Sequence, residues 1–305
     1  MRLRFALIAV AAGLLPLSSM QGAVAAQEAG QQDPAAAPMA SETQSATPKD
    51  DSASIDALFD ALGLGQVIET MRAEGLDYGA DLKADLLAGQ NAAGWEETVS
   101  QIHDAAVLDR LVRSELAERL AGVDTAPLVA FFESPLGQRI VALEIEARVA
   151  MAMEGAEEAA RTRYAQMLKD GGPRTDALAE LIEIGDLVEW NVMGAMNSNY
   201  AFYTGLLDGQ GDMASPDINE EQILTDVWGQ EEEIRTDTAE WIGAYLALAY
   251  EPLSDEQIAQ YAEFSRGAPA QALNRALFGA FDVMYAQISR ALGFAAATYM
   301  RGEDI

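Results

Sequence analysis

Histidine is the first side chain to consider for chemistry, and the chain has one, His103, beside Asp104. An imidazole next to a carboxylate can act as a general acid or base. A catalytic triad or a histidine metal site needs further partners, yet the sequence has no second histidine, no His-Glu-x-x-His pattern and no cysteine. We therefore expect His103 to be a structural residue at an exposed or half-buried helix position. We predict no catalytic, cofactor-binding or metal-binding residue.

Carboxylates are the second group with chemical potential. Glu154, Glu157 and Glu158 fall close together on a helix surface, as do Glu180 and Glu183. Two carboxyl groups can hydrolyse a glycosidic bond when one is kept protonated and the other ionised. Exposed carboxyl groups are solvated, which does not suit this division of roles. A carboxylate-dependent hydrolase is therefore the least favoured of the functions considered.

A third candidate is the segment 190–203, whose composition is unusual for a helix. Gly194, Ser198, Ala201 and Gly205 form a stripe of small residues that lets another helix approach closely. Amide, methionine and tyrosine side chains beside it form the predicted ligand or partner surface: Asn191, Met193, Met196, Asn197, Tyr200 and Tyr203. Such a face suits a ligand pocket or a partner groove. The alternative is a tightly packed central helix with satisfied buried amides.

The elements that position these residues are predicted to be helices. Apolar residues recur at three- and four-residue intervals, and no alternating β-branched run occurs, so the predicted fold class is all-α. The long predicted helices cover residues 95–120, 135–169, 175–207 and 218–250, the last with a break near Gly229. Capping boxes are predicted at Asp217 with Glu220 and at Ser254 with Gln257.

A helical elbow is predicted at residues 131–137, which read Phe-Phe-Glu-Ser-Pro-Leu-Gly. Phe131 and Phe132 end a short apolar helix. Ser134 can cap the next helix, and Pro135 suits its first position, where no N–H is needed. The structural elbow of the first half thus consists of Phe131, Phe132, Ser134, Pro135 and Gly137. We predict a second elbow at Gly267–Pro269.

The chain is predicted to contain two related helical bundles. Gly171-Gly172-Pro173 is a strong helix stop, so we expect a first helical domain at 53–171 and a second at 172–305. A shift of 133 positions places Trp228 on Trp95 and Phe264 on Phe131 (228 − 95 = 133) without a gap. We interpret the second half as a divergent repeat of the first.

The N-terminus predicts export. Arg2 and Arg4 precede an apolar run and small residues near Ala26, so we expect a signal peptide at 1–26, cleaved near Ala26, and a disordered linker at 27–52. The expected location is the periplasm or the cell exterior, with no integral membrane span after cleavage. Without cysteine the fold has no disulfide. A net charge of −30 disfavours nucleic acid as a partner.

The elbow also carries a resemblance. Phe131-Phe132-Glu133-Ser134-Pro135-Leu136-Gly137-Gln138 resembles the bacterial family called domain of unknown function 2059, in which an aromatic pair, a Ser-Pro and a glycine follow in this order. The resemblance covers about 108–169, and more loosely 241–300. There Phe264-Ser265-Arg266-Gly267-Ala268-Pro269 lacks the Ser-Pro pair. It implies a secreted, helical protein and no known activity, cofactor or catalytic residue.

Together these observations favour a non-enzymatic binding or interaction module of the bacterial cell envelope, with another envelope protein as its partner in a groove between the halves. The alternative is a small apolar or amphipathic ligand in an interhelical cavity beside Tyr200 and Tyr203. The oligomeric state is left open.

Overall fold

The segments with helical periodicity in the sequence form helices in the structure. The computed structural model describes residues 3–4, 13–14, 51–211 and 219–302. In these ranges the all-α prediction is confirmed, apart from an antiparallel pair of two-residue strands, β1 (Leu3–Arg4) and β2 (Gly13–Leu14). The rest of the predicted signal peptide and most of the predicted linker, up to residue 50, lie outside the described residues.

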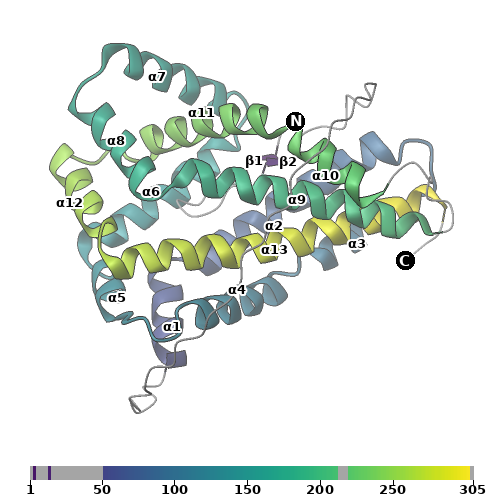
Figure 1. Cartoon of the computed structure of the whole chain (residues 1–305), viewed down its shortest axis with the longest axis horizontal. Helices are drawn as coiled ribbons and strands as arrows, with labels where there is room; N and C mark the ends of the chain where they lie inside the picture. Colours follow the sequence, from purple (N-terminus) through teal and green to yellow (C-terminus); the bar gives the residue numbers. More distant parts are fainter. Residues whose placement is uncertain (1–2, 5–12, 15–50, 212–218, 303–305) are drawn as a thin grey trace, which may run out of the picture.

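The helices follow one another with short connections (Figure 1). In chain order they are α1 (Asp51–Ala61), α2 (Leu64–Leu86), α3 (Trp95–Ile102), α4 (Ala105–Arg119), α5 (Ala126–Phe132), α6 (Pro135–Met151), α7 (Ala156–Asp170), α8 (Pro173–Ile184), α9 (Leu187–Gln210), α10 (Glu220–Trp228), α11 (Glu231–Ala249), α12 (Asp255–Ser265) and α13 (Ala268–Met300). Among them, none combines the length and the apolar composition that crossing a bilayer requires.

Three predicted long helices are each interrupted, which corrects the sequence analysis. The helix over 95–120 breaks after His103, because the Asp104 carboxylate accepts a hydrogen bond from the Val107 N–H (2.9 Å) and starts α4. The helix over 135–169 breaks at Gly155, whose φ of 75° is left-handed. The helix over 175–207 breaks at Asp186, also left-handed with φ 49°.

The other predicted helix boundaries agree better with the structure. The break near Gly229 is confirmed, since α10 ends at Trp228 and α11 begins at Glu231. The capping box of Ser254 and Gln257 is present at the start of α12. Asn219 caps α10 by accepting from the Gln222 N–H. The predicted cap Asp217 lies outside the described residues.

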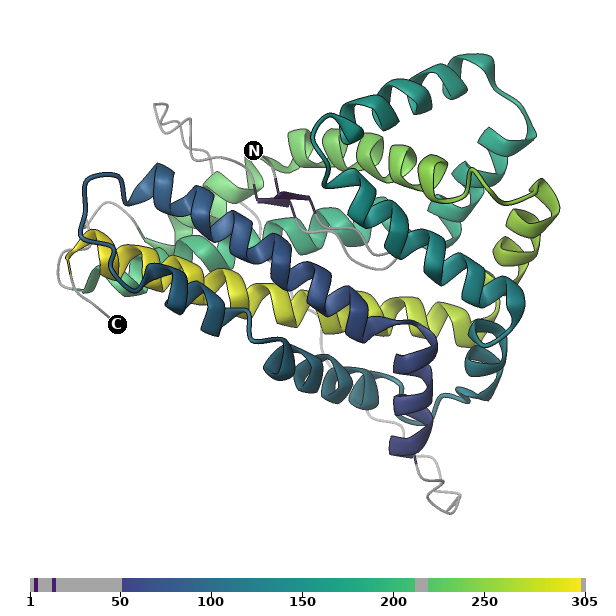
Figure 2. The same ribbon diagram turned by 180° about the vertical axis from the view of Figure 1, so that it is seen from behind.

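Helix α13 is the central helix, because helices from both halves of the chain pack against it. It runs beside α9 in Figure 1, and in Figure 2 the view from behind shows α2 lying across it; α3 and α4 also contact it. The backbones of α9 and α13 touch closely. A Cβ on Gly205 would lie 2.1 Å from the Arg290 carbonyl oxygen, and one on Gly293 would lie 2.1 Å from the Phe202 carbonyl oxygen. Gly205 therefore lets α13 approach α9 closely, as the stripe of small residues predicted.

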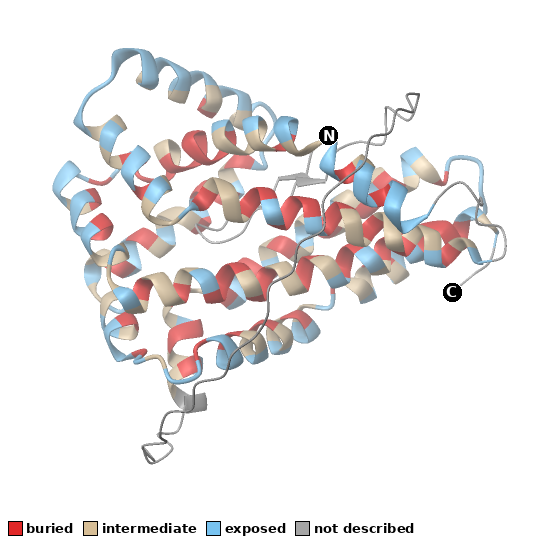
Figure 3. Ribbon diagram, in the orientation of Figure 1, coloured by how far each residue is buried: buried red, intermediate tan, exposed pale blue. Residues whose placement is uncertain are grey.

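The buried residues form a core that both halves of the chain share. The largest cluster of packed apolar residues extends from Ile55 in α1 to Tyr299 in α13, and burial concentrates along the inner faces of α9 and α13 (Figure 3). The hydroxyls of Thr98 and Tyr299 lie 3.1 Å apart and link α3 to the last helix. The division into domains at 53–171 and 172–305 stays a prediction.

The two elbows coincide in register and meet in space. Helices α6 and α13 begin at Pro135 and Ala268, which are 133 positions apart (268 − 135 = 133), the same shift that aligned the halves. The rings of Phe131 and Phe264, also related by this shift, stack with their centroids 3.6 Å apart. The elbows therefore pack against each other, although the repeat itself stays a prediction.

Candidate functional site

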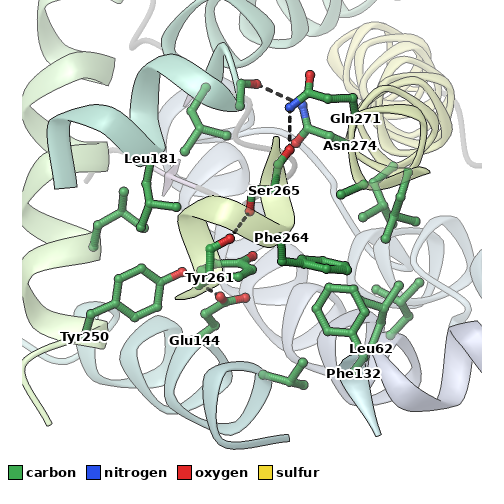
Figure 4. A pocket seen from close by; sticks show the side chains of 18 residues that line it. Leu62, Phe132, Glu144, Leu181, Tyr250, Tyr261, Phe264, Ser265, Gln271 and Asn274 are labelled. Atoms are coloured by element: carbon green, nitrogen blue, oxygen red, sulfur yellow. Dashed lines mark hydrogen bonds between the residues drawn. The ribbon is translucent and has the colours of Figure 1, made fainter. Parts of the chain in front are cut away.

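A cavity of about 80 Å³ lies where the two elbows meet (Figure 4). Its walls are mostly apolar and come from both halves of the chain. They include Leu62, Phe132, Leu181, Leu246, Phe264 and Leu277. One water needs roughly 10–15 Å³ of such volume, so the cavity has room for about five to eight non-hydrogen atoms. A small ligand fits, and a long chain does not.

The first elbow fixes one wall of the cavity. Ser134 caps α6, its hydroxyl accepting from the Gly137 N–H (3.1 Å) and donating to the Phe131 carbonyl (2.6 Å), with Pro135 at the first helical position. Gly137 must be glycine, because a Cβ there would lie 2.1 Å from the Phe131 carbonyl oxygen. These contacts confirm the predicted elbow. They also direct Phe132 into the cavity.

A carboxyl group stands inside these apolar walls. Glu144 of α6 points into the cavity between Tyr250 and Tyr261 (Figure 4), and its Oε1 accepts a hydrogen bond from the Tyr250 hydroxyl (2.7 Å). Burial raises the pKa of Glu144 to about 8, and the Tyr250 hydrogen bond opposes this rise only in part. The carboxyl is therefore mainly protonated at neutral pH when the cavity holds no cation.

Glu144 does not pair with the arginine one turn along its helix. The four-residue spacing of Glu144 and Arg148 predicts a pair on the solvated side of a helix, and the structure corrects this expectation. Arg148 is instead only 4% exposed, and it pairs with Glu74 of α2 through two contacts of 3.0 and 2.6 Å. This bidentate pair satisfies Arg148, so Glu144 keeps no cationic partner among the described residues that line the cavity.

Polar side chains close the opposite end of the cavity, and the amide group of each donates to backbone carbonyls. The Gln271 amide donates to the carbonyls of Ile184 (2.9 Å) and Ser265 (2.8 Å). The Asn274 amide donates to the Gly185 carbonyl (2.8 Å). These bonds tie α13 to the ends of α8 and α12. The amide oxygens are the acceptors that these two side chains have left.

Two arginines hold the turn that presents Tyr250. Arg174 of α8 donates to the carbonyls of Tyr250 (3.0 Å) and Leu253 (2.6 Å), and Arg139 of α6 donates to the Pro252 carbonyl (2.7 Å). The carbonyls at the end of α11 thereby find partners. These bonds fix the backbone that carries the Tyr250 ring, and the hydroxyl of that ring faces Glu144.

The predicted ligand or partner surface on α9 is largely covered by other helices of the same chain. Met196 is buried with Ile223 and Val227 of α10, and Tyr200 and Tyr203 pack against the same cluster. The Tyr200 hydroxyl donates to Glu220. Met193 alone of the aromatic and methionine members is strongly exposed, at 47%. The cavity between the elbows is lined by Tyr250 and Tyr261 and does not include Tyr200 or Tyr203.

The predicted asparagines differ in their surroundings. Asn191 is buried, and its amide donates to the Leu187 carbonyl (2.6 Å), while its Oδ1 has no hydrogen-bond partner among the described atoms. Asn197 is exposed and donates to Asp282 of α13 (3.0 Å). The alternative of a tightly packed central helix therefore describes most of α9, with one amide oxygen left unsatisfied.

The other chemistry candidates are not gathered into a site. His103 is 4% exposed, more buried than expected, and its ring meets Gly75 and donates its Nδ1–H to the Val99 carbonyl (2.9 Å). Burial lowers the pKa of His103. Glu157 pairs with Arg161, and Glu180 with Arg266. In the described ranges, no three histidine or acidic residues group as metal ligands would.

Sequence reasoning missed Glu144, Tyr250 and Tyr261 as site residues. Glu144 and Tyr250 are 106 positions apart, so no local spacing joins them. One signal was present: Glu144 follows Ile140 and Leu143 on the apolar side of α6, where a carboxyl needs a partner from another element.

Comparison with known proteins gives one match. Residues 108–163 match the model of a family described as an uncharacterized protein conserved in bacteria (DUF2059). This confirms the local resemblance and does not extend to the second half. The matched residues span α4, α5, α6 and the start of α7, and so include the first elbow and Glu144. No curated protein and no solved structure matches the chain.

Proposed function

We propose that this chain is a non-enzymatic binding module that takes up a small, mainly apolar ligand with one polar group in the cavity between its elbows. The cavity itself carries the proposal, because it joins apolar walls to a single carboxyl in a space suited to a few atoms. A well-packed core leaves few voids of this size. This site replaces the one expected beside Tyr200 and Tyr203.

Binding is favoured over hydrolysis by the number of carboxyl groups. Glycosidase chemistry needs an acid and a second carboxylate within about 5–10 Å. Of the described residues that line the cavity, Glu144 is the one with a carboxyl group. A lone acid can hold a polar group of a ligand, whereas hydrolysis needs a further group to activate water.

The test uses 1-butanol, a neutral amphiphile of five non-hydrogen atoms that the cavity volume accommodates. Ligand-observed NMR should show saturable binding with a millimolar dissociation constant, as expected for so few atoms. Ala270 lines the cavity, so Ala270→Leu should fill it and weaken binding at least tenfold. Ala165→Leu, on the exposed face of α7, is the matched control. Absence of saturable binding to the wild-type chain would refute the proposal.

Export to the cell envelope forms part of the proposal. Its support is the N-terminal order of Arg2 and Arg4, an apolar run and small residues near Ala26. The absence of cysteine leaves packing alone to hold the exported fold. Fractionation of producing cells with N-terminal sequencing of the mature chain is the test, and a cytoplasmic chain that keeps its N-terminus would contradict it.

An envelope protein as partner is a second candidate, supported by exposed apolar residues on α10. Leu224 and Trp228, one helical turn apart, are 41% and 65% exposed. Glu221 on the same helix and Glu232 nearby are acidic and exposed, which favours a basic partner surface. Crosslinking in producing cells should recover a partner that is lost in Trp228→Ala and kept in Gln222→Ala. Recovery that Trp228→Ala leaves unchanged would refute this candidate.

A further inference from the structure

We infer that the ligand of the elbow cavity is a small aliphatic amine, bound as its ammonium ion with its N–H groups on the Glu144 carboxylate. This inference rests on the proposed function, because it names the chemical class that the same cavity takes.

Hydrogen-bond accounting carries the inference. Several donors around the cavity are already engaged: Tyr250 donates to Glu144, the Ser265 hydroxyl donates to the Tyr261 carbonyl (2.8 Å), and the Gln271 and Asn274 amides donate to backbone carbonyls. Oxygen acceptors remain: the second carboxyl oxygen of Glu144 and the two amide oxygens. A ligand rich in N–H donors complements this set.

Charge and aromatic surroundings favour the same ligand. The described lining contains no lysine or arginine that would repel a cation. It does contain the rings of Phe132, Tyr250, Tyr261 and Phe264, and aromatic faces attract ammonium groups. The net charge of −30 also draws cations toward the protein. A free carboxylate ligand would meet none of these conditions.

Binding of the ammonium ion is coupled to release of one proton. Glu144 is protonated in the empty cavity at neutral pH and gives up its proton to form the ion pair, so the complex gains the cation and solvent gains H⁺. With a pKa of about 8 for Glu144, amine affinity should fall about tenfold for each pH unit below 8 and level off above it.

The other groups around Glu144 do not titrate in this range. Burial raises the pKa of Tyr245, Tyr250 and Tyr261 well above the ordinary phenol value, so these residues of α11 and α12 stay neutral. Arg148, one turn along α6, stays cationic beside Glu74. The lining residues from α8, α9 and α13 carry no titratable side chain.

Three probes with five non-hydrogen atoms separate the alternatives: n-butylamine, which carries the cation, 1-butanol, which is neutral, and 2-butanone, which only accepts hydrogen bonds. Dissociation constants are measured by ligand-observed NMR on the full chain between pH 6 and 9. At pH 9 the amine should bind at least tenfold more tightly than 2-butanone. Its affinity should fall about a hundredfold by pH 6.

Substitution of the carboxyl supplies the control. Glu144→Gln keeps the shape of the side chain and should abolish both the preference for amine and its pH dependence, while 1-butanol still binds. Glu146→Gln, on the exposed face of the same helix, should change neither. An amine that binds no better than 2-butanone at pH 9, or equally at pH 6 and 9, overturns the inference and leaves the proposed function standing. Failure of all three probes overturns both.

Discussion

At the scale of single residues, Glu144 couples the cavity to the stability of the fold. Its pKa of about 8 exceeds the ordinary value of 4.5 because burial disfavours the charged form. A carboxyl with a raised folded-state pKa contributes stability below its unfolded pKa. That contribution is lost as the pH rises through the folded-state pKa. The relevant window for this chain is pH 4.5 to about 8.

Glu144→Gln should therefore stabilise the protein relative to wild type as the pH rises. The amide stays neutral, whereas the wild-type carboxyl must ionise in an apolar cavity. Between pH 5 and 9 the difference in unfolding free energy should change by up to about 4 kcal/mol in favour of the variant. Urea unfolding at each pH measures it, with Glu146→Gln as the control. A pH-independent difference would show that Glu144 is solvated in the folded state.

The buried ion pair of Arg148 and Glu74 should respond strongly to loss of one partner. Glu74→Gln leaves the Arg148 guanidinium, 4% exposed, without its counter-charge. The expected loss is about 3–5 kcal/mol of unfolding free energy. The matched control is Glu251→Gln, because Glu251 pairs with Arg163 at the surface and exposed pairs contribute about 0–1 kcal/mol. Equal losses in the two variants would contradict this account of Arg148.

At the scale of elements, the sequence predicted helix starts better than it predicted helix breaks. Ser134 with Pro135, and Ser254 with Gln257, fix helix starts through contacts within four positions, so their spacing is visible in the sequence. The breaks at Asp104, Gly155 and Asp186 interrupt segments whose apolar periodicity continues across them. The Asp104 cap and the left-handed Gly155 are themselves local features, but the continuing periodicity hides them in the sequence.

Two glycine substitutions should have opposite effects, because one glycine lies where α9 and α13 cross and the other lies in an open position of α2. Gly205→Ala puts a methyl group 2.1 Å from the Arg290 carbonyl oxygen, so the helices must separate. We expect a loss of about 2–4 kcal/mol of unfolding free energy. Gly65→Ala, in an open position of α2 with no atom within 4 Å of the new methyl, should instead be neutral or stabilise by about 0.5–1 kcal/mol. Thermal and urea unfolding of both variants measure these two changes in stability.

At the scale of the whole molecule, the site depends on contacts that span the chain. The rings of Phe131 and Phe264, which the sequence shift places in equivalent positions, stack across 133 positions (264 − 131 = 133). The cavity beside them also needs Leu181 of α8 and Glu144 of α6. The sequence could predict the first elbow from its local spacing. It could not predict that the elbows meet, because that contact depends on how α6, α8, α11 and α13 pack together.

The charge of the whole chain predicts how salt affects its stability. Forty-nine acidic side chains face nineteen lysines and arginines, so even complete ion pairing leaves thirty negative charges unneutralised (49 − 19 = 30). Repulsion among these carboxylates opposes the compact state. Raising NaCl from 10 to 200 mM shortens the Debye length from about 30 Å to below 10 Å and should raise the Tm by several degrees. Near the isoelectric point, where net charge is small, the same salt should leave the Tm almost unchanged. A Tm that falls with salt at neutral pH would mean that surface ion pairs such as Lys83 with Glu96 outweigh the repulsion.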